Sequence, residues 1–311
     1  MSVNKDIYIQ KRIAPIAPLL PKMVYGNKPV DDGNLLLSGP EKNELVTSHP
    51  IAQVYIKRIM GSDELINGIE RWCLWITDEQ WASAKKIDAI QKRVENVQQM
   101  RLKSKDLGAN KLANKPYQFR EMYTANYNQI IIPAVSSENR EYIPLGFCDS
   151  NIVVTNRNFA IYDPELYIFG IISSLMHMVW VRAVAGRLET RFNYSSTICY
   201  NAFPFPIISD TLKQQLTQCT LKILEEREKH PEKTLAELYD PDKMPDGLRE
   251  AHHQNDLVVE RCYRSKPFTS DEERLEHLFK LYEQMIEEEK NRGTLFEAES
   301  RPAKKAGKKK A

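Results

Sequence analysis

Residues 162–206 read YDPELYIFGIISSLMHMVWVRAVAGRLETRFNYSSTICYNAFPFP, and this stretch decides the fold. Its first half, residues 166–184, is apolar nearly all round, and a helix with that pattern must be buried on most sides. The length approaches that of a membrane span. However, Ser173, Ser174, His177 and Arg182 interrupt it, and a charge inside a span costs several kcal/mol. We therefore expect a core helix and no membrane span.

The second half of the stretch changes its pattern after Gly186, which we expect to end the helix as a C-cap. Beyond it, polar and less polar side chains alternate as in an extended strand. The two expected faces are Glu189, Arg191 and Asn193 on one side and Leu188, Thr190 and Phe192 on the other. Glutamate, arginine and asparagine read base edges in a DNA major groove. Spacing alone favours a solvated strand face over base readout, so both interpretations stay open.

Charge is unevenly distributed around the net value of +2. Residues 1–206 hold 24 Lys and Arg against 20 Asp and Glu, whereas residues 207–300 hold 14 against 22. Within the first part, residues 85–120 carry ten basic and three acidic side chains. Such a stripe can neutralise DNA phosphates, and a solvated helix face is the equally weighted alternative. The basic side chains expected toward solvent or DNA are Lys92, Arg93, Arg101, Lys103, Lys105 and Lys115.

The region before the central stretch predicts short elements and one long helix. Residues 1–46 are rich in Pro and Gly and predict loops and short strands, with a turn at DDGN. Residues 50–68 predict a helix, followed by the apolar run RWCLWI. Residues 78–107 predict one long polar helix. Its expected buried stripe is Trp81, Ile87, Ile90, Val94 and Val97.

Four short strands are expected in QIIIPAV, EYIPLGF, NIVVTN and FAIYD, and the internal prolines place them at edges or bends. Between the last two strands, Asn156, Arg157 and Asn158 form a polar loop tip.

Beyond Pro206 the sequence predicts helices: residues 210–229 with Asp210 as N-cap, HHQNDLVVERCY, and a third opened by a capping box from Ser270 to Glu273. Adjacent histidines at 252 and 253 cannot both face one ion, so we expect no metal there. The acidic helices should pack on partner helices or on other domains. The final RPAKKAGKKKA predicts a disordered basic tail.

Several long blocks resemble a known family. SSLMHMVWVRAVAGRLETRFNYSSTICYNAFPFP closely resembles the target-recognition region of MmeI-like type IIL (type IIG) restriction-modification enzymes. In the same order, and covering roughly residues 21–290, further matches are PKMVYGNKPVDDGNLLLS, YIKRIMGSDELINGIERWCLWI, IIIPAVSSENREYIPLGF and ILEEREKHPEKTLAELYDPDKMPDGLREAHHQNDLVVERCY. In such enzymes one polypeptide usually carries a nuclease, an adenine-N6 DNA methyltransferase, a target-recognition domain and a helical C-terminal segment.

The resemblance implies an α+β fold. Residues 1–209 would form a mixed α/β target-recognition domain with short strands around a buried helix, residues 210–295 an all-helical domain, and residues 296–311 the tail. It also implies that Glu189 and Arg191, with Asn193 beside them, read a base pair of double-stranded DNA. Asn156 and Arg157 are second-rank base-reading candidates.

Catalytic motifs of the parent enzyme are missing from this sequence. The family's methyltransferase uses a glycine-rich turn for S-adenosylmethionine and an Asn-Pro-Pro-aromatic motif, whereas NAFPFP lacks paired prolines after Asn201. YDPDK around Asp240 does not complete a PD-(D/E)xK nuclease. We therefore expect no catalytic site, cofactor or metal in this chain, with S-adenosylmethionine and Mg²⁺ used by the parent's methyltransferase and nuclease.

The five cysteines lack CxxC spacing and no secretory signal is present, which favours a reduced cytoplasm without disulfides or zinc. The leading hypothesis is a DNA reader that works with methyltransferase and nuclease domains of the parent enzyme or of a separate subunit. The alternative is an interaction scaffold, in which the helical C-terminus docks a separate catalytic subunit and DNA contact is incidental.

Overall fold

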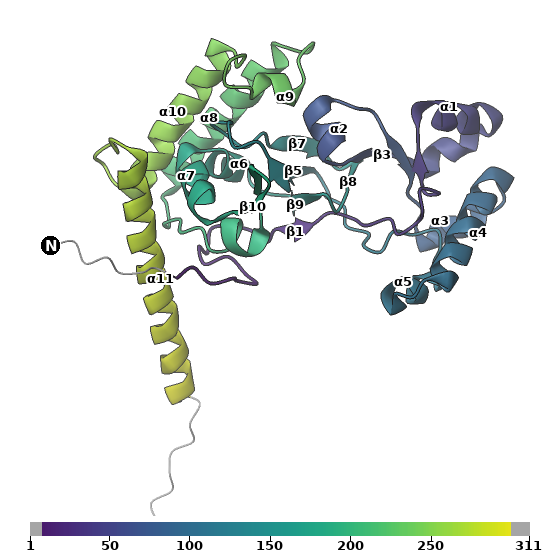
Figure 1. The fold of residues 1–311 in the computed structure, drawn as a ribbon, viewed down its shortest axis with the longest axis horizontal. Coiled ribbons are helices and arrows are strands. Elements are labelled where there is room, and N and C mark those ends of the chain that lie inside the picture. Colours follow the sequence, from purple (N-terminus) through teal and green to yellow (C-terminus); the bar gives the residue numbers. More distant parts are fainter. Residues whose placement is uncertain (1–7, 300–311) are drawn as a thin grey trace, which may run out of the picture.

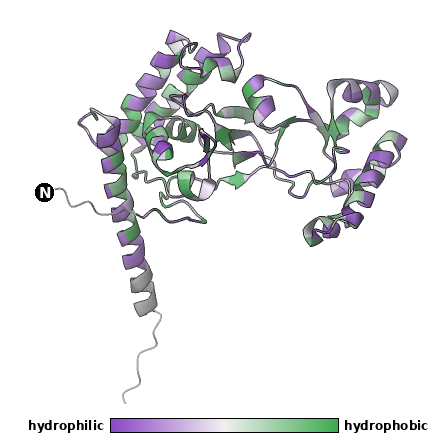
Figure 2. Ribbon diagram, in the orientation of Figure 1, coloured by the Kyte–Doolittle hydropathy of each residue, from purple (hydrophilic) through white to green (hydrophobic). Residues whose placement is uncertain are grey.

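Residues 8–299 are described by the computed structural model, and they form an α+β fold, as expected. Figure 1 shows an N-terminal lobe at one end of the long axis, a central sheet, and the C-terminal helices at the other end. In Figure 2 apolar residues gather in the central sheet and the helices on it, whereas the outer helices are mixed. Among the described residues, no helix is both long and apolar enough to cross a bilayer.

The central sheet is antiparallel and has the order β1-β9-β5-β7. Its strands are β1 (Val24–Tyr25), β9 (Asn158–Tyr162), β5 (Asn128–Pro133) and β7 (Gly146–Asp149). The strand in QIIIPAV is therefore interior and not at an edge, and the expected alternative, a bend, is present at Ala134 directly after Pro133. Pro133 is tolerated because it is the last residue of β5, where the ladder ends. Of EYIPLGF, only the final Gly-Phe joins a strand.

The expected core helix is present but divided. It consists of α6 (Tyr167–Ile172), which is buried throughout, and α7 (Leu175–Val184), which is buried from Met176 to Val181. The break occurs because Ser174 caps a new helix, its Oγ accepting a hydrogen bond from the His177 amide at 3.2 Å. Gly186 is not the C-cap: Ala185 occupies that position, and Gly186 already starts a strand.

Four C-terminal helices cover this core: α8 (Asp210–Glu228), α9 (Leu235–Leu238), α10 (Asp246–Tyr263) and α11 (Asp271–Glu299). Helix α8 packs between α6 and α10. A Cβ on Gly170 would lie 2.8 Å from the Asn255 side-chain oxygen and 2.9 Å from Thr220 Oγ1, so glycine is needed for this close approach. Ser209, rather than Asp210, caps α8.

The start of α11 is stabilised as predicted, since the Glu273 amide donates to Ser270 Oγ at 3.2 Å. Helix α11 continues to Glu299, so four residues assigned to the tail are helical. The rest of the predicted tail, residues 300–311, lies outside the described residues.

The N-terminal lobe contains a second sheet of order β2-β4-β3-β8. Its strands are β2 (Leu36–Leu37), β4 (Trp72–Leu74), β3 (Ile56–Met60) and β8 (Ile152–Val154), the last parallel to β3. The single helix predicted over residues 50–68 is wrong: a 3₁₀ turn, Pro50–Tyr55, leads into β3, and only α2 (Ser62–Asn67) is α-helical. Pairing of β3 with strands on both sides outweighs local preference.

Helices complete this lobe: α1 (Gly39–Ser48), α3 (Asp78–Ala84), α4 (Asp88–Lys103) and α5 (Leu107–Lys111), with a 3₁₀ turn at Leu112–Asn114. Helix α1 lies in a region expected to hold only loops and strands. The long helix predicted over residues 78–107 is broken between Ala84 and Asp88. The DDGN turn is confirmed, with positive φ at Asp32 and Gly33.

Arg101 is fully buried and joins the pieces of the N-terminal lobe. Its Nε donates to the Val30 carbonyl at 2.8 Å, and its two terminal nitrogens donate to four further carbonyls. These are Leu112 and Lys115 from Nη1, and Pro29 and Gln118 from Nη2, at 2.7–3.0 Å. All five N–H donors of the guanidinium are therefore used. The expectation that Arg101 faces solvent or DNA was wrong, because no donor remains for a phosphate.

Asp256 is a second buried charged group, at the contact of α10 with α7. Its Oδ1 accepts from the Leu175 amide and its Oδ2 from the Tyr142 hydroxyl, both at 2.7 Å. Burial raises the pKa of Asp256 to about 7. No group of His, Cys, Asp and Glu within residues 8–299 is arranged to hold a metal ion, and the neighbouring His252 instead contacts the Tyr239 hydroxyl at 2.8 Å.

Arg101→Met should destabilise the fold by about 3 kcal/mol or more, since five buried carbonyls lose their donors. Urea unfolding measures the change. Lys103→Met is the matched control, because Lys103 is exposed on the same helix, and its effect should stay within about 0.5 kcal/mol. Equal midpoints for the two variants would contradict the structural role of Arg101.

Asp256→Asn should change how stability depends on pH. The folded-state pKa is raised above the unfolded value, so ionisation costs stability as pH rises from about 4 to 7, and the full cost is present above pH 7. Asparagine can keep both contacts without the charge. We expect the variant's stability, relative to the original chain, to be roughly 2 kcal/mol higher at pH 8 than at pH 5. Parallel pH profiles in chemical unfolding would argue against a raised pKa.

Candidate nucleic-acid interface

A β-hairpin follows directly from the end of α7. Strands β10 (Gly186–Leu188) and β11 (Arg191–Asn193) are joined by a turn at Glu189 and Thr190. Strand β11 also pairs with β6 (Val135–Ser136), which attaches the hairpin to the core. The single extended strand expected here was therefore wrong. The sequence does not predict this turn, because Glu and Thr are not among the residues that usually mark turns.

The hairpin register decides which side chains share a face. Leu188 lies opposite Arg191, and Gly186 lies opposite Asn193, and cross-strand partners project to the same side. Leu188, Arg191 and Asn193 are all exposed, whereas Phe192 projects to the other side and is buried. Leu188 thus belongs to the face of Arg191, not to that of Phe192 as expected, because the chain reverses between them. It is a candidate contact residue that the sequence pattern missed.

Glu189 occupies the tip of the hairpin with φ of 57°, in the left-handed region that favours glycine. Its Oε2 lies 2.6 Å from Nη2 of Arg191, and both side chains are largely exposed. Glu189 therefore lies beside Arg191 because the two side chains form an ion pair, and not because they share one face of an extended strand. Strained non-glycine residues cost on the order of 1–2 kcal/mol and cluster at functional sites.

The loop tip with Asn156 and Arg157 connects β8 of one sheet to β9 of the other, at the junction of the lobes. The backbones at Gly26 and Thr155 come close together here, since a Cβ on Gly26 would lie 2.2 Å from the Thr155 carbonyl oxygen. Arg157 is exposed and Asn156 is half-buried. Asn158, which follows them, is buried and accepts a hydrogen bond from Ser62 at 2.8 Å.

One residue links this turn to the hairpin. The Ala134 amide donates to the Arg157 carbonyl at 3.4 Å, and the Ala134 carbonyl accepts from the Tyr194 amide at 2.8 Å. Tyr194 directly follows β11. The structure thus brings the two predicted base-reading segments to opposite sides of the same short connection between β5 and β6.

The turn also borders a cavity of about 550 Å³. Its charged lining residues are Asp31, Asp32, Asp63 and Glu64 against Lys28, Arg71 and Arg157. Because carboxylates are in the majority, this cavity is a poor place for a DNA phosphate.

Apart from the buried Arg101, the basic side chains predicted to contact the DNA backbone divide into three groups. Lys92, Lys103 and Lys105 are exposed, as expected. Arg93 is partly engaged, since Nη2 lies 2.5 Å from Glu41 and Nη1 donates to two carbonyls. Lys115 is exposed but lies 2.5 Å from an Asp78 carboxylate oxygen.

Helix geometry relates two of the exposed lysines. Lys92 and Lys103 are close to three turns apart on α4, so they lie on the same side of the helix, roughly 16 Å from one another. Lys85 and Lys86, which precede α4, and Lys111, the last residue of α5, are also exposed. Figure 1 places α4 and α5 at the opposite end of the molecule from α11.

Two family descriptions match consecutive parts of the chain: "MmeI, target recognition domain" matches residues 3–207, and "MmeI, C-terminal domain" matches residues 208–288. DNA methyltransferase A of Bacillus subtilis (strain 168) is 45% identical over 285 residues, which cover 91% of this chain and 32% of that protein.

A solved structure is also similar. The type IIL restriction-modification enzyme MmeI, determined in complex with DNA, aligns with a TM-score of 0.86 and 37% identity over 91% of this chain and 38% of that chain. The chain therefore spans about a third of the length of the two proteins. The resemblance stated from the sequence is confirmed.

Glu189→Gly should leave the fold as stable as before or raise its stability by up to about 1 kcal/mol, because glycine adopts the positive φ without strain. Thr190→Gly is the control at the neighbouring position, which has no positive φ, and it should cost about 0.5–1 kcal/mol. Thermal and urea unfolding of both variants measure the difference. A larger loss for Glu189→Gly than for Thr190→Gly would show that the ion pair outweighs the strain.

Proposed function

The chain belongs to the MmeI family, and we propose that it reads the sequence of double-stranded DNA as the specificity part of a restriction-modification DNA methyltransferase. The supporting observation is the exposed hairpin β10–β11, which carries Leu188, Arg191 and Asn193 on one face and Glu189 at its tip. A two-stranded β-ribbon has the size to enter a major groove. The relatives, one named a DNA methyltransferase and one solved with DNA, support the same class of function.

The side chains on the hairpin fit base edges in complementary ways. Arginine forks onto the two acceptors of guanine, and glutamate accepts from the amino group of cytosine. Because Glu189 and Arg191 already form a pair, together they suit one G·C base pair. Asn193 suits adenine, and Leu188 suits the methyl group of thymine. Asn156 and Arg157 would reach neighbouring base pairs from the adjoining turn.

The N-terminal lobe would hold the DNA backbone without reading sequence. Lys92, Lys103 and Lys105 are exposed for phosphate contacts, and Arg93 and Lys115 become available if they exchange a carboxylate partner for a phosphate. Arg101 does not belong to this group, because its N–H donors bind backbone carbonyls within the lobe.

Catalysis would lie with the other domains of the parent enzyme, in the same polypeptide or in a separate subunit. S-adenosylmethionine would bind in the methyltransferase and Mg²⁺ in the nuclease, while this chain selects the DNA site at which they act.

Arg191→Ala should weaken binding to the preferred DNA by about 1–3 kcal/mol and relax the preference at one base pair, since a bidentate contact is lost. The preferred DNA is first selected by the purified chain from a randomised duplex pool at low salt and then used in competition assays. An unchanged ranking of DNA sequences in the Arg191→Ala variant would refute base readout by this hairpin.

Lys103→Ala should weaken binding to all DNA sequences alike. It should also lower the slope of log affinity against log salt concentration by roughly one or less, as expected for one lost phosphate contact. Titrations at several salt concentrations with preferred and scrambled duplexes measure both effects. A loss confined to the preferred duplex would contradict this role.

If the chain shows no DNA affinity at low salt but binds a methyltransferase subunit independently of salt, the scaffold alternative is correct.

A further inference from the structure

Arg182 lies in the last turn of α7, four residues before the hairpin begins, and it contacts two other parts of the chain. Its Nη1 lies 3.2 Å from Oδ2 of Asp271, the first residue of α11. Its Nη2 donates to the Arg140 carbonyl at 3.4 Å. One guanidinium thus connects the end of α7, the C-terminal helices and the loop after β6.

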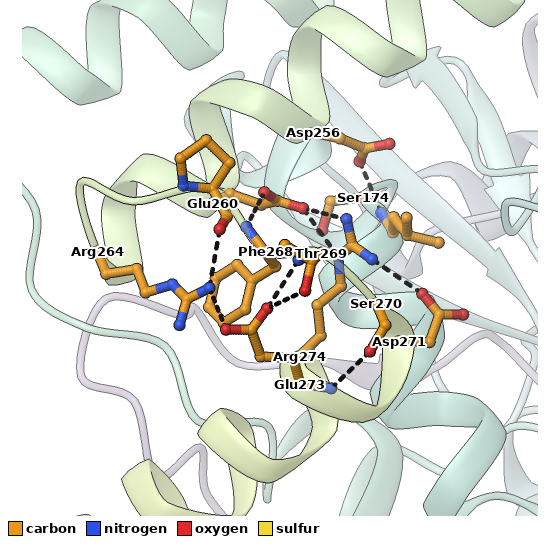
Figure 3. A network of polar contacts seen from close by, with 12 residues as sticks. Ser174, Asp256, Glu260, Arg264, Phe268, Thr269, Ser270, Asp271, Glu273 and Arg274 are labelled. Atoms are coloured by element: carbon orange, nitrogen blue, oxygen red, sulfur yellow. Dashed lines mark hydrogen bonds and ion pairs between the residues drawn. The ribbon is translucent and has the colours of Figure 1, made fainter.

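Asp271 is itself held in place by the network drawn in Figure 3. Its Oδ1 accepts from Arg274 Nη1 at 3.1 Å, and Arg274 also donates to Oε1 of Glu260 from Nε and Nη2, at 2.8 and 2.6 Å. Glu260 is buried on α10, and its Oε2 accepts from the Phe268 amide at 3.2 Å. The carboxylate that faces Arg182 is therefore anchored to two C-terminal helices.

The other contact of Arg182 leads to the hairpin. The Arg140 side chain donates to Ser136 Oγ at 3.4 Å, and Ser136 is the β6 partner of Phe192 in β11. In the same loop, a hydrogen bond with Thr190 holds the pKa of Glu138 below its usual range, and the charges of Arg187 and Arg191 act in the same direction. The loop of residues 137–141 therefore lies against the tip of the hairpin.

The base of the hairpin has its own anchor, because the Tyr194 hydroxyl contacts Nε2 of the buried His177 at 3.0 Å. The tip is held instead by the loop of residues 137–141, through the contact of Glu138 with Thr190. Each hairpin strand has only three residues, and the outer face is exposed. Its orientation toward DNA then depends on the end of α7 and on the loop, which are the two elements that Arg182 joins.

We propose that Arg182 is a positioning residue for base recognition: its bonds to Asp271 and to the Arg140 carbonyl fix the angle at which the hairpin meets DNA. The C-terminal domain then contributes to base discrimination without touching a base. This inference rests on the proposed DNA-reading function. The competing view is that Arg182 and Asp271 form an ordinary partly exposed ion pair, which contributes little.

The test compares Arg182→Gln, Arg182→Lys, Asp271→Asn and the double variant Arg182→Gln/Asp271→Asn in the full chain. Arg12→Gln is the matched control, because Arg12 pairs with Glu289 on the same helix α11 at 2.6 Å. The first readout is amide hydrogen exchange over residues 186–193 in the free chain. The second is discrimination between the selected duplex and duplexes changed at one base pair.

We expect Arg182→Gln to speed hairpin exchange about threefold or more and to reduce discrimination by roughly three- to tenfold, the size of effects transmitted through an intervening element. Affinity for scrambled duplex at low salt should stay within about twofold, since phosphate contacts are untouched. Arg182→Lys should be intermediate, because one ammonium cannot reproduce the forked geometry. The double variant should be no worse than the worse single variant.

Unchanged hairpin exchange and unchanged discrimination in Arg182→Gln, even with lowered global stability, would overturn the proposal. Equal effects in Arg12→Gln would do the same. If the original chain enriches no motif from the random pool, the proposed reading function fails. The exchange rates then decide by themselves whether Arg182 positions the hairpin.

Discussion

Helix α7 is apolar around most of its circumference, so its burial requires a neighbour on nearly every side. Helices α6, α10 and α11 and the turn at Ser196–Tyr200 supply those neighbours, and Trp180 of α7 lies within 5.8 Å, centroid to centroid, of the rings of Phe279 and Tyr282 on α11. One hydrophobic core consequently runs from Ile16 to Tyr282, across both family-matched regions. The recognition half and the helical half are thus distinct by family but share a core.

The N-terminal lobe has a separate and smaller core, and a polar interaction joins its parts. Arg101 reaches the carbonyls of three segments that have no regular pairing with one another. It also holds the Val30 carbonyl, where a β-branched residue has φ of 49°, a conformation that is costly and persists only under such constraint. The buried Arg101 therefore donates hydrogen bonds to backbone carbonyls that water cannot reach, as the N–H groups of a neighbouring strand do in a sheet.

Features that depend on local periodicity were predictable from the sequence. The buried segment of α6 and α7, the amphipathic α8 and the capped start of α11 all follow from spacing and capping residues. Arg101 continues the buried stripe of Ile90, Val94 and Val97 at helical spacing, which indicates burial. Its charge favours an exposed position instead, and here the spacing is the better guide. Local sequence predicts a helix at β3, since one of the two strands that pair with β3, β8, comes about ninety residues later.

In the candidate site, too, some features follow from the local sequence and others depend on pairing between distant segments. The sequence supplied the residue types of Glu189, Arg191 and Asn193, and the family resemblance supplied the role that we propose for them. The turn that moves Leu188 to the face of Arg191, and the Ala134 link to Arg157, arise from pairing between distant segments. In the hairpin, Phe192 and Tyr194 point inward and anchor the ribbon, whereas Arg191 and Asn193 point outward. Because inward and outward residues alternate, the outward side chains can be substituted with little cost to the core. Glu189 is the exception, since its positive φ restricts which residues fit the tip.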